Sequence, residues 1–168
     1  MPDKLLPIEQ ILTLLDEAPR RIAEVTAGLA PARLRTAPND DEWSANDVLA
    51  HLRACADVWG GSIVTMVHED HPTIRAINPR TWIRDTDYLD RAFRPSLRAY
   101  TRQRTELLAL LEPLSLEDWS RGGTFTGAGR PLERTVRSEA DAIARHERSH
   151  IKQIARLATG EQGRYPGM

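Results

Sequence analysis

Apolar residues recur at steps of three and four positions over four long stretches of the chain, a spacing typical of helices with one buried face. The stretches cover residues 7–29, 44–69, 87–112 and 131–159. No segment between them shows a convincing alternation of apolar and polar positions, which a half-buried strand would require. The pattern therefore predicts an all-α fold built from four long helices.

Capping and turn residues indicate where these helices begin and end. Ser44 stands at an N-cap position, and Asp47 three residues later completes a capping-box pair. Pro131 is predicted at the first position of the last helix, where proline is well tolerated. Gly160 is a good C-terminal stop, and Pro95 should kink the third helix or lie in its first turns.

The connections between the helices differ in length and composition. Residues 30–43 are polar, whereas residues 69–86 form a long irregular connection of the kind that is often functional or lid-like. Residues 120–130 are rich in glycine and are expected to form a loop or a small hairpin. An antiparallel four-helix bundle is the most economical architecture, and metal sites are commonly built in bundle cores from facing helices.

Composition narrows the class of protein. The 168 residues correspond to a single domain, 1–168, that is long enough to bury a core without disulfides. The net charge of −1 argues against a nucleic-acid binder, which normally carries a basic excess. No apolar run is long enough to span a membrane, and no signal peptide is apparent. We therefore expect a cytoplasmic protein that binds neither nucleic acid nor membrane.

Two of the five histidines lie on the apolar face of the last predicted helix. His146 and His150 are four residues apart, so their side chains project from one face in successive turns. Two buried imidazoles need hydrogen-bonding partners, and a divalent metal ion supplies a partner to both at once. The alternative is a pair of histidines that bond to the backbone or to carboxylates.

His51 is the third candidate ligand, at the edge of the apolar stripe of the second helix. In an antiparallel bundle it can face the middle of the last helix, and three imidazoles with an open position are typical of catalytic zinc sites. Taken alone, His51 would more often be a capping or packing residue. His68 and His71 follow at the end of the second helix and in the next loop, where interaction with the helix dipole explains them; they are spare ligands only if that loop folds over the site.

Each of three further residues near these histidines has two possible roles. Cys55, one turn after His51, could reach a metal ion or act as a redox thiol, but a lone buried cysteine is more often a small hydrophobe. Asp47 could orient the His51 ring, although its capping role already explains it. Glu147 could act as a base beside the site or pair with an arginine.

Residues 146–150 also spell H-E-x-x-H, the motif that carries two zinc ligands and a general-base Glu in metalloproteases. A protease of that class needs a third ligand downstream, and no histidine follows His150. Its extended motif would also have a glycine where Gln153 stands. A metalloprotease is therefore an unlikely alternative.

Two segments resemble motifs of the DinB/YfiT-like superfamily. Residues 43–52, Trp-Ser-Ala-Asn-Asp-Val-Leu-Ala-His-Leu, resemble the opening of its second helix, and His146-x-x-x-His150-x-x-Gln153-Ile154 resembles its closing motif. The stretch around Leu114 to Trp119 also fits, so the resemblance spans about residues 8–160. It implies a four-helix bundle of up-down-down-up type, in which zinc or nickel is held by His51, His146 and His150.

The resemblance leaves the reaction open. Members of this family are often homodimers, and their known or proposed activities include thiol-dependent S-transfer, related isomerisation and hydrolysis. We therefore expect a metal-dependent transferase or hydrolase that acts on a small molecule, with a low-molecular-weight thiol as a further candidate cofactor. A non-catalytic, stress-related bundle that binds a metal or a ligand is the alternative.

Overall fold

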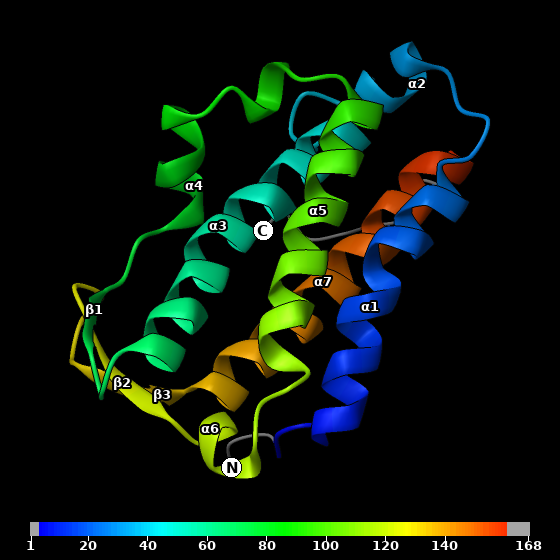
Figure 1. Cartoon of the computed structure of the whole chain (residues 1–168). Helices are drawn as coiled ribbons and strands as arrows, with labels where there is room; N and C mark the ends of the chain where they lie inside the picture. Colours follow the sequence, from blue (N-terminus) through cyan, green and yellow to red (C-terminus); the bar gives the residue numbers. More distant parts are fainter. Residues whose placement is uncertain (1–3, 161–168) are drawn as a thin grey trace.

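The structure, a computed structural model, describes residues 4–160. Four long helices account for most of this part of the chain, and short helices and strands occupy the connections between them (Figure 1). In chain order the elements are α1 (Ile8–Val25), α2 (Pro31–Arg35), α3 (Ala45–His68), β1 (Thr73–Arg75), α4 (Pro79–Trp82), η1 (Ile83–Asp85), η2 (Tyr88–Asp90), α5 (Phe93–Leu111), α6 (Leu116–Trp119), β2 (Gly122–Thr126), β3 (Leu132–Thr135) and α7 (Val136–Thr159).

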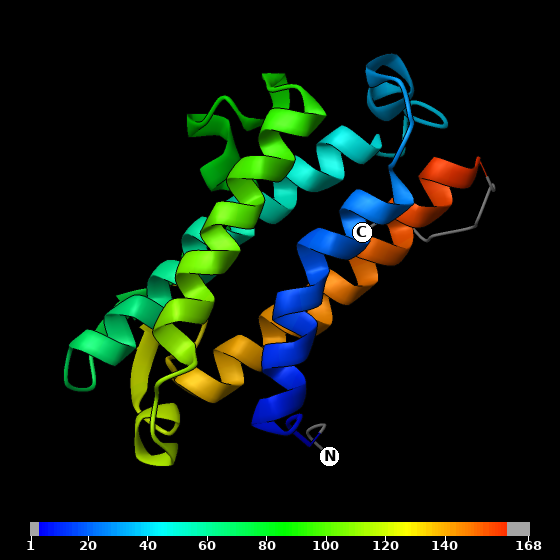
Figure 2. The ribbon, with the colours of Figure 1, turned by 45° about the vertical axis from the view of Figure 1, so that its right-hand side comes forward.

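The four long helices, α1, α3, α5 and α7, form a bundle, which confirms the predicted fold class. In Figures 1 and 2, α1 and α7 run in one direction and α3 and α5 in the other. This is the up-down-down-up order that the resemblance implied. Two parallel helices need a long connection to return the chain to its starting end, and the connection between α3 and α5 meets this need with β1, α4, η1 and η2. The long segment after α3 therefore follows from the topology.

The helix ends match the predicted ones where a cap specifies them. Ser44 accepts a hydrogen bond from the Asp47 amide and Asp47 accepts one from the Ser44 amide, so the predicted capping box is present. Gly160 ends α7 in a left-handed conformation with φ of 72°. Pro95 lies in the first turn of α5, as expected, because a proline there removes no internal hydrogen bond.

Two predicted helix starts were wrong. The last helix begins at Val136 instead of Pro131, because Leu132–Thr135 pairs with β2 and the Thr135 side chain caps the helix through the Ser138 amide. The third helix begins at Phe93 instead of residue 87, since Tyr88–Asp90 forms a separate turn of 3-10 helix.

A small three-stranded sheet closes one end of the bundle, and the helical periodicity did not predict its full extent. β2 and β3 form an antiparallel hairpin that pairs Phe125 with Leu132, which agrees with the small hairpin expected near residues 120–130. β1 adds to this hairpin in parallel, with Ile74 beside Phe125. With only three to five residues each, these strands are too short to show a period of two.

The core consists of two apolar clusters with a polar layer between them. The cluster nearer the sheet includes Leu107 of α5 and Ala144 of α7, and the other cluster includes Tyr100 of α5 and Ile154 of α7. Residues 101–106 and 145–153 lie between these boundaries and include Arg104, His146, Glu147 and His150, whereas His51 of the candidate site belongs to α3. No helix within residues 4–160 is both long and apolar enough to cross a lipid bilayer.

Candidate metal centre

The three predicted ligands meet inside the bundle. The Nε2 atom of His146 lies 3.3 Å from Nε2 of His51 and 3.1 Å from Nε2 of His150. Helix α3 supplies His51 and α7 supplies the other two. The two helices run in opposite directions, so the first turns of α3 lie beside the second half of α7. His51 is 8% exposed and His150 only 1%, and His146 is half-buried, so the cluster lies largely inside the bundle.

These separations fit a shared metal ion. Two nitrogen ligands of a tetrahedral zinc ion, each at about 2.0–2.1 Å, lie about 3.3–3.4 Å apart. The observed 3.1 and 3.3 Å, both measured from Nε2 of His146, match this spacing. Three neutral imidazoles can also bond to one another, but each ring has only one N–H to donate.

The hydrogen bonds around the cluster leave nitrogen lone pairs directed at its centre. Nδ1 of His150 lies 2.9 Å from Oε1 of Gln153, so Nδ1 donates and Nε2 keeps its lone pair. Histidine ligands of metal ions typically donate their second nitrogen in this way. Nδ1 of His146 is buried and has no hydrogen-bond partner among the described residues. The cluster is thus incomplete as a hydrogen-bonded unit, and its donor set fits a divalent ion.

Two tryptophans border the imidazoles. The Trp43 ring lies 5.2 Å from the His51 ring and is stacked on His150 at 6.4 Å, with 17° between the planes. Trp59 meets His146 edge to face at 4.8 Å. Apolar walls of this kind restrict water at a site and hold the rings in place.

The surroundings keep the imidazoles uncharged. Burial lowers the pKa of His51 to about 4, with smaller contributions from the neighbouring His150 ring and from the charge of Arg80. Burial and the two neighbouring histidines lower the pKa of His146 to about 3, and burial also lowers the pKa of His150. All three rings are therefore neutral near pH 7, which is the state that a metal ligand requires.

Cys55 borders the same cluster. Its sulfur lies 3.5 Å from Nε2 of His51, and the residue is 3% exposed. Burial, and to a lesser degree the negative charge of Glu147, raises the pKa of this thiol in the absence of a metal ion. The ligand atoms of His51, Cys55 and His146 all lie within 4.8 Å of one another.

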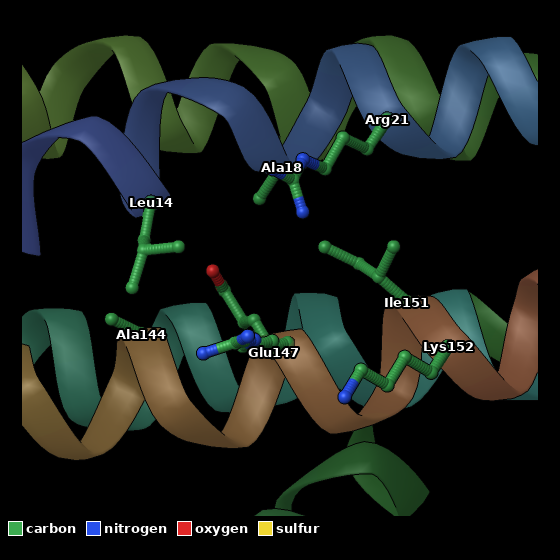
Figure 3. A pocket seen from close by; sticks show the side chains of 8 residues that line it. Leu14, Ala18, Arg21, Ala144, Glu147, Ile151 and Lys152 are labelled. Carbon is green, nitrogen blue, oxygen red and sulfur yellow. The ribbon is translucent and has the colours of Figure 1, made fainter.

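Glu147, the acidic residue of the H-E-x-x-H motif, does not join the cluster. Both of its carboxylate oxygens accept hydrogen bonds from Arg104 of α5, one of them at 2.6 Å, and Arg104 also donates to the Leu15 carbonyl at 3.1 Å. Figure 3 shows Glu147 projecting from α7 towards α1, beside a small pocket of about 40 Å³. Of the two roles considered for it, the structure shows the pairing with an arginine.

The two remaining histidines lie elsewhere. His71 pairs with Glu133 at 2.9 Å and lies 3.2 Å from the Thr124 hydroxyl, on the edge of the small sheet. His68 is exposed in the last turn of α3, which agrees with its predicted place at the end of that helix. Neither contributes an atom to the cluster.

Comparison with known proteins places the chain in a family. The model of the DinB superfamily matches residues 14–154, which is most of the sequence. The chain belongs to the DinB superfamily. This confirms the resemblance drawn from the two motifs.

A solved structure shares the DinB fold over nearly the whole chain. YfiT from Bacillus subtilis, described as a probable metal-dependent hydrolase with an unusual four-helix bundle topology, superposes with a TM-score of 0.80. The match covers 95% of this chain and 92% of that one, at 19% sequence identity. At this identity the likeness shows the fold. No curated protein matches the sequence significantly.

Sequence reasoning missed several residues around this DinB-type cluster. Gln153 appeared in the sequence analysis only as a motif position, and Trp59 was not singled out there. Gln153 is three residues after His150, so its reach to that ring could have been found from helical spacing. The contact of Trp59 with His146 joins two different helices, and no local signal encodes it.

Proposed function

We propose that His51, His146 and His150 bind a divalent metal ion, and that this DinB-superfamily chain is a metal-dependent enzyme acting on a small molecule. The observation that carries the proposal is that Nε2 of His146 lies 3.3 Å from Nε2 of His51 and 3.1 Å from Nε2 of His150. Zinc or nickel is the predicted ion, since both accept imidazole ligands.

A divalent ion held by three neutral histidines keeps its full charge and supplies Lewis acidity, lowering the pKa of a bound water or thiol and polarising an electrophile. The residues of this chain position that chemistry. Gln153 orients His150 through its Nδ1–H, while Trp43 and Trp59 form walls that restrict water. Glu147 is occupied by Arg104 and does not serve as a base.

Hydrolysis of a small molecule is the first candidate reaction. The fold shared with YfiT, itself described as a probable metal-dependent hydrolase, supports it. Because Glu147 is withdrawn into an ion pair, this reaction would not follow the H-E-x-x-H protease scheme, in which that Glu acts as general base.

Thiol-dependent S-transfer is the second candidate, and the charge near the cluster favours it. Arg80 is close enough that its positive charge contributes to lowering the pKa of His51, Cys55 and His150. A cation there also attracts an anionic ligand such as a thiolate. In this reaction the thiolate sulfur forms a bond to an electrophilic carbon, and the leaving group departs with its electron pair.

Elemental analysis tests the metal site directly. We expect purified protein repleted with zinc or nickel to hold about one ion per chain, and His51→Ala to hold less than about 0.1. His68→Ala is the matched control, because it removes an exposed histidine of the same helix. Metal retention by His51→Ala equal to that of the control would contradict the proposed ligand set.

An activity panel then separates the candidate reactions. Simple ester and amide substrates test hydrolysis, and low-molecular-weight thiols with electrophilic acceptors test S-transfer. We expect turnover in one panel that His51→Ala abolishes. Full metal binding with no turnover in either panel would support the alternative, a non-catalytic metal-binding bundle. Homodimerisation stays a prediction that sedimentation of the same sample can test.

A further inference from the structure

Cys55 lies where one more metal ligand could bind. It follows His51 by four residues on α3, so both side chains point from one face of the helix towards α7. The ligand atoms of His51, Cys55 and His146 all lie within 4.8 Å of one another, and His150 is not part of this group. The thiol is therefore part of the cluster by position.

The distance from Cys55 to His51 matches that in a mixed nitrogen and sulfur site. In a tetrahedral zinc site, with Zn–N of about 2.0–2.1 Å and Zn–S of about 2.3 Å, a sulfur and a nitrogen ligand lie about 3.5–3.6 Å apart. The sulfur of Cys55 lies 3.5 Å from Nε2 of His51. The two ring nitrogens of His51 are the hydrogen-bonding neighbours of this sulfur among the described residues.

We propose that the Cys55 thiolate is the fourth protein ligand of the metal ion, which makes the resting site three histidines and one cysteine. The inference rests on the proposed metal site. As the sulfur–metal bond forms, the thiol proton leaves to solvent, and no electron is transferred.

A fourth protein ligand changes how the site would work. Catalytic zinc sites usually keep one position open, whereas four protein ligands close the coordination sphere. A small molecule would then have to displace Cys55 or expand the coordination number before it could react. A thiolate ligand also favours zinc over hard oxygen-seeking ions such as magnesium.

Cobalt substitution tests the fourth ligand by spectroscopy. The protein is loaded with Co²⁺ in a buffer that contains a phosphine reductant, because an added thiol would itself bind the ion. We expect an intense thiolate-to-cobalt charge-transfer band in the near ultraviolet. Since the chain contains a single cysteine, any such band reports Cys55.

Two variants test the assignment of the band to Cys55. In Cys55→Ala we expect the band to disappear while three histidines still bind cobalt, with an affinity that is weaker by about tenfold or more. Cys55→Ser keeps the size of the side chain and should also lose the band. Circular dichroism of each metal-free variant checks that the fold is retained.

The outcomes separate this inference from the proposed function. Cobalt bound by the unaltered chain with no charge-transfer band would overturn the role of Cys55 and leave the three-histidine site standing. No cobalt or zinc binding at all would overturn both. Equal affinity in the unaltered chain and Cys55→Ala would also contradict a fourth ligand.

Discussion

The Arg104–Glu147 ion pair and the histidine cluster both lie inside this bundle, and they differ in whether their polar groups are matched by opposite charge. Arg104 and Glu147 form an ion pair with exposures of 2% and 3%, and every carboxylate oxygen has a donor. One residue away on α7, His146 meets two other imidazoles and leaves a buried nitrogen without a partner. Two adjacent residues of one motif, His146 and Glu147, thus have different roles.

The difference is informative because buried polar groups are costly unless they are paired. The opposite charges of Arg104 and Glu147 match each other, so the ion pair is explained as part of the core, although Nε of Arg104 has no hydrogen-bond partner among the described residues. Imidazole lone pairs that face one another need a cation or a hydrogen-bond donor between them, and a metal ion supplies the cation. The contrast separates the structural residue of H-E-x-x-H, Glu147, from the two histidines.

Breaking the ion pair should have the largest effect. Glu147→Ala leaves Arg104 charged and buried, so we expect the free energy of unfolding to fall by about 3–5 kcal/mol in urea titrations. The double variant Glu147→Leu with Arg104→Met should recover much of that loss, since an apolar pair can replace a buried ion pair. If Glu147→Ala were neutral for stability, the structural role would be wrong.

A smaller effect should follow when the partner of His150 is removed. Gln153→Ala frees the Nδ1–H of His150, and we expect the affinity for zinc to fall by about 10–100-fold while stability without metal changes little. Isothermal titration with zinc measures this. Lys152→Ala on the same helix is the control, and an equal loss in both variants would contradict a specific role for Gln153.

The smallest effect concerns pH and the metal-free protein. The pKa of His51 is about 4 and that of His146 about 3 in the fold, against an ordinary value of 6.5. Between about pH 6.5 and pH 3 the unfolded chain therefore binds more protons than the folded one, so stability should fall as the pH drops through this window.

Urea titrations at several pH values in the presence of a chelator measure this dependence. The variant that combines His51→Ala and His146→Ala should lose part of it, because its unfolded chain no longer gains those protons. The same pH slope in the unaltered chain and in this variant would show that the cluster does not control the dependence.

Much of the fold and of the site could be predicted from local patterns. Helical periodicity located the four long helices, and the capping box at Ser44 placed the start of α3. The spacing of His146 and His150 indicated a common face, and the resemblance to the DinB family indicated His51 as their partner. The start of α7 was predicted at Pro131, which is too early. Proline suits the first turn of a helix, and the pairing of the next four residues with β2 cannot be read from their local sequence.

The sequence by itself determined which residues lie on one helix face, because a helix of 3.6 residues per turn makes that a local property. Which faces meet was decided only by the tertiary structure. The packing of α3 against α7 brings Trp59 to His146, and the packing of α5 gives Glu147 its partner Arg104. These contacts join residues that are far apart in the chain, so no local spacing encodes them.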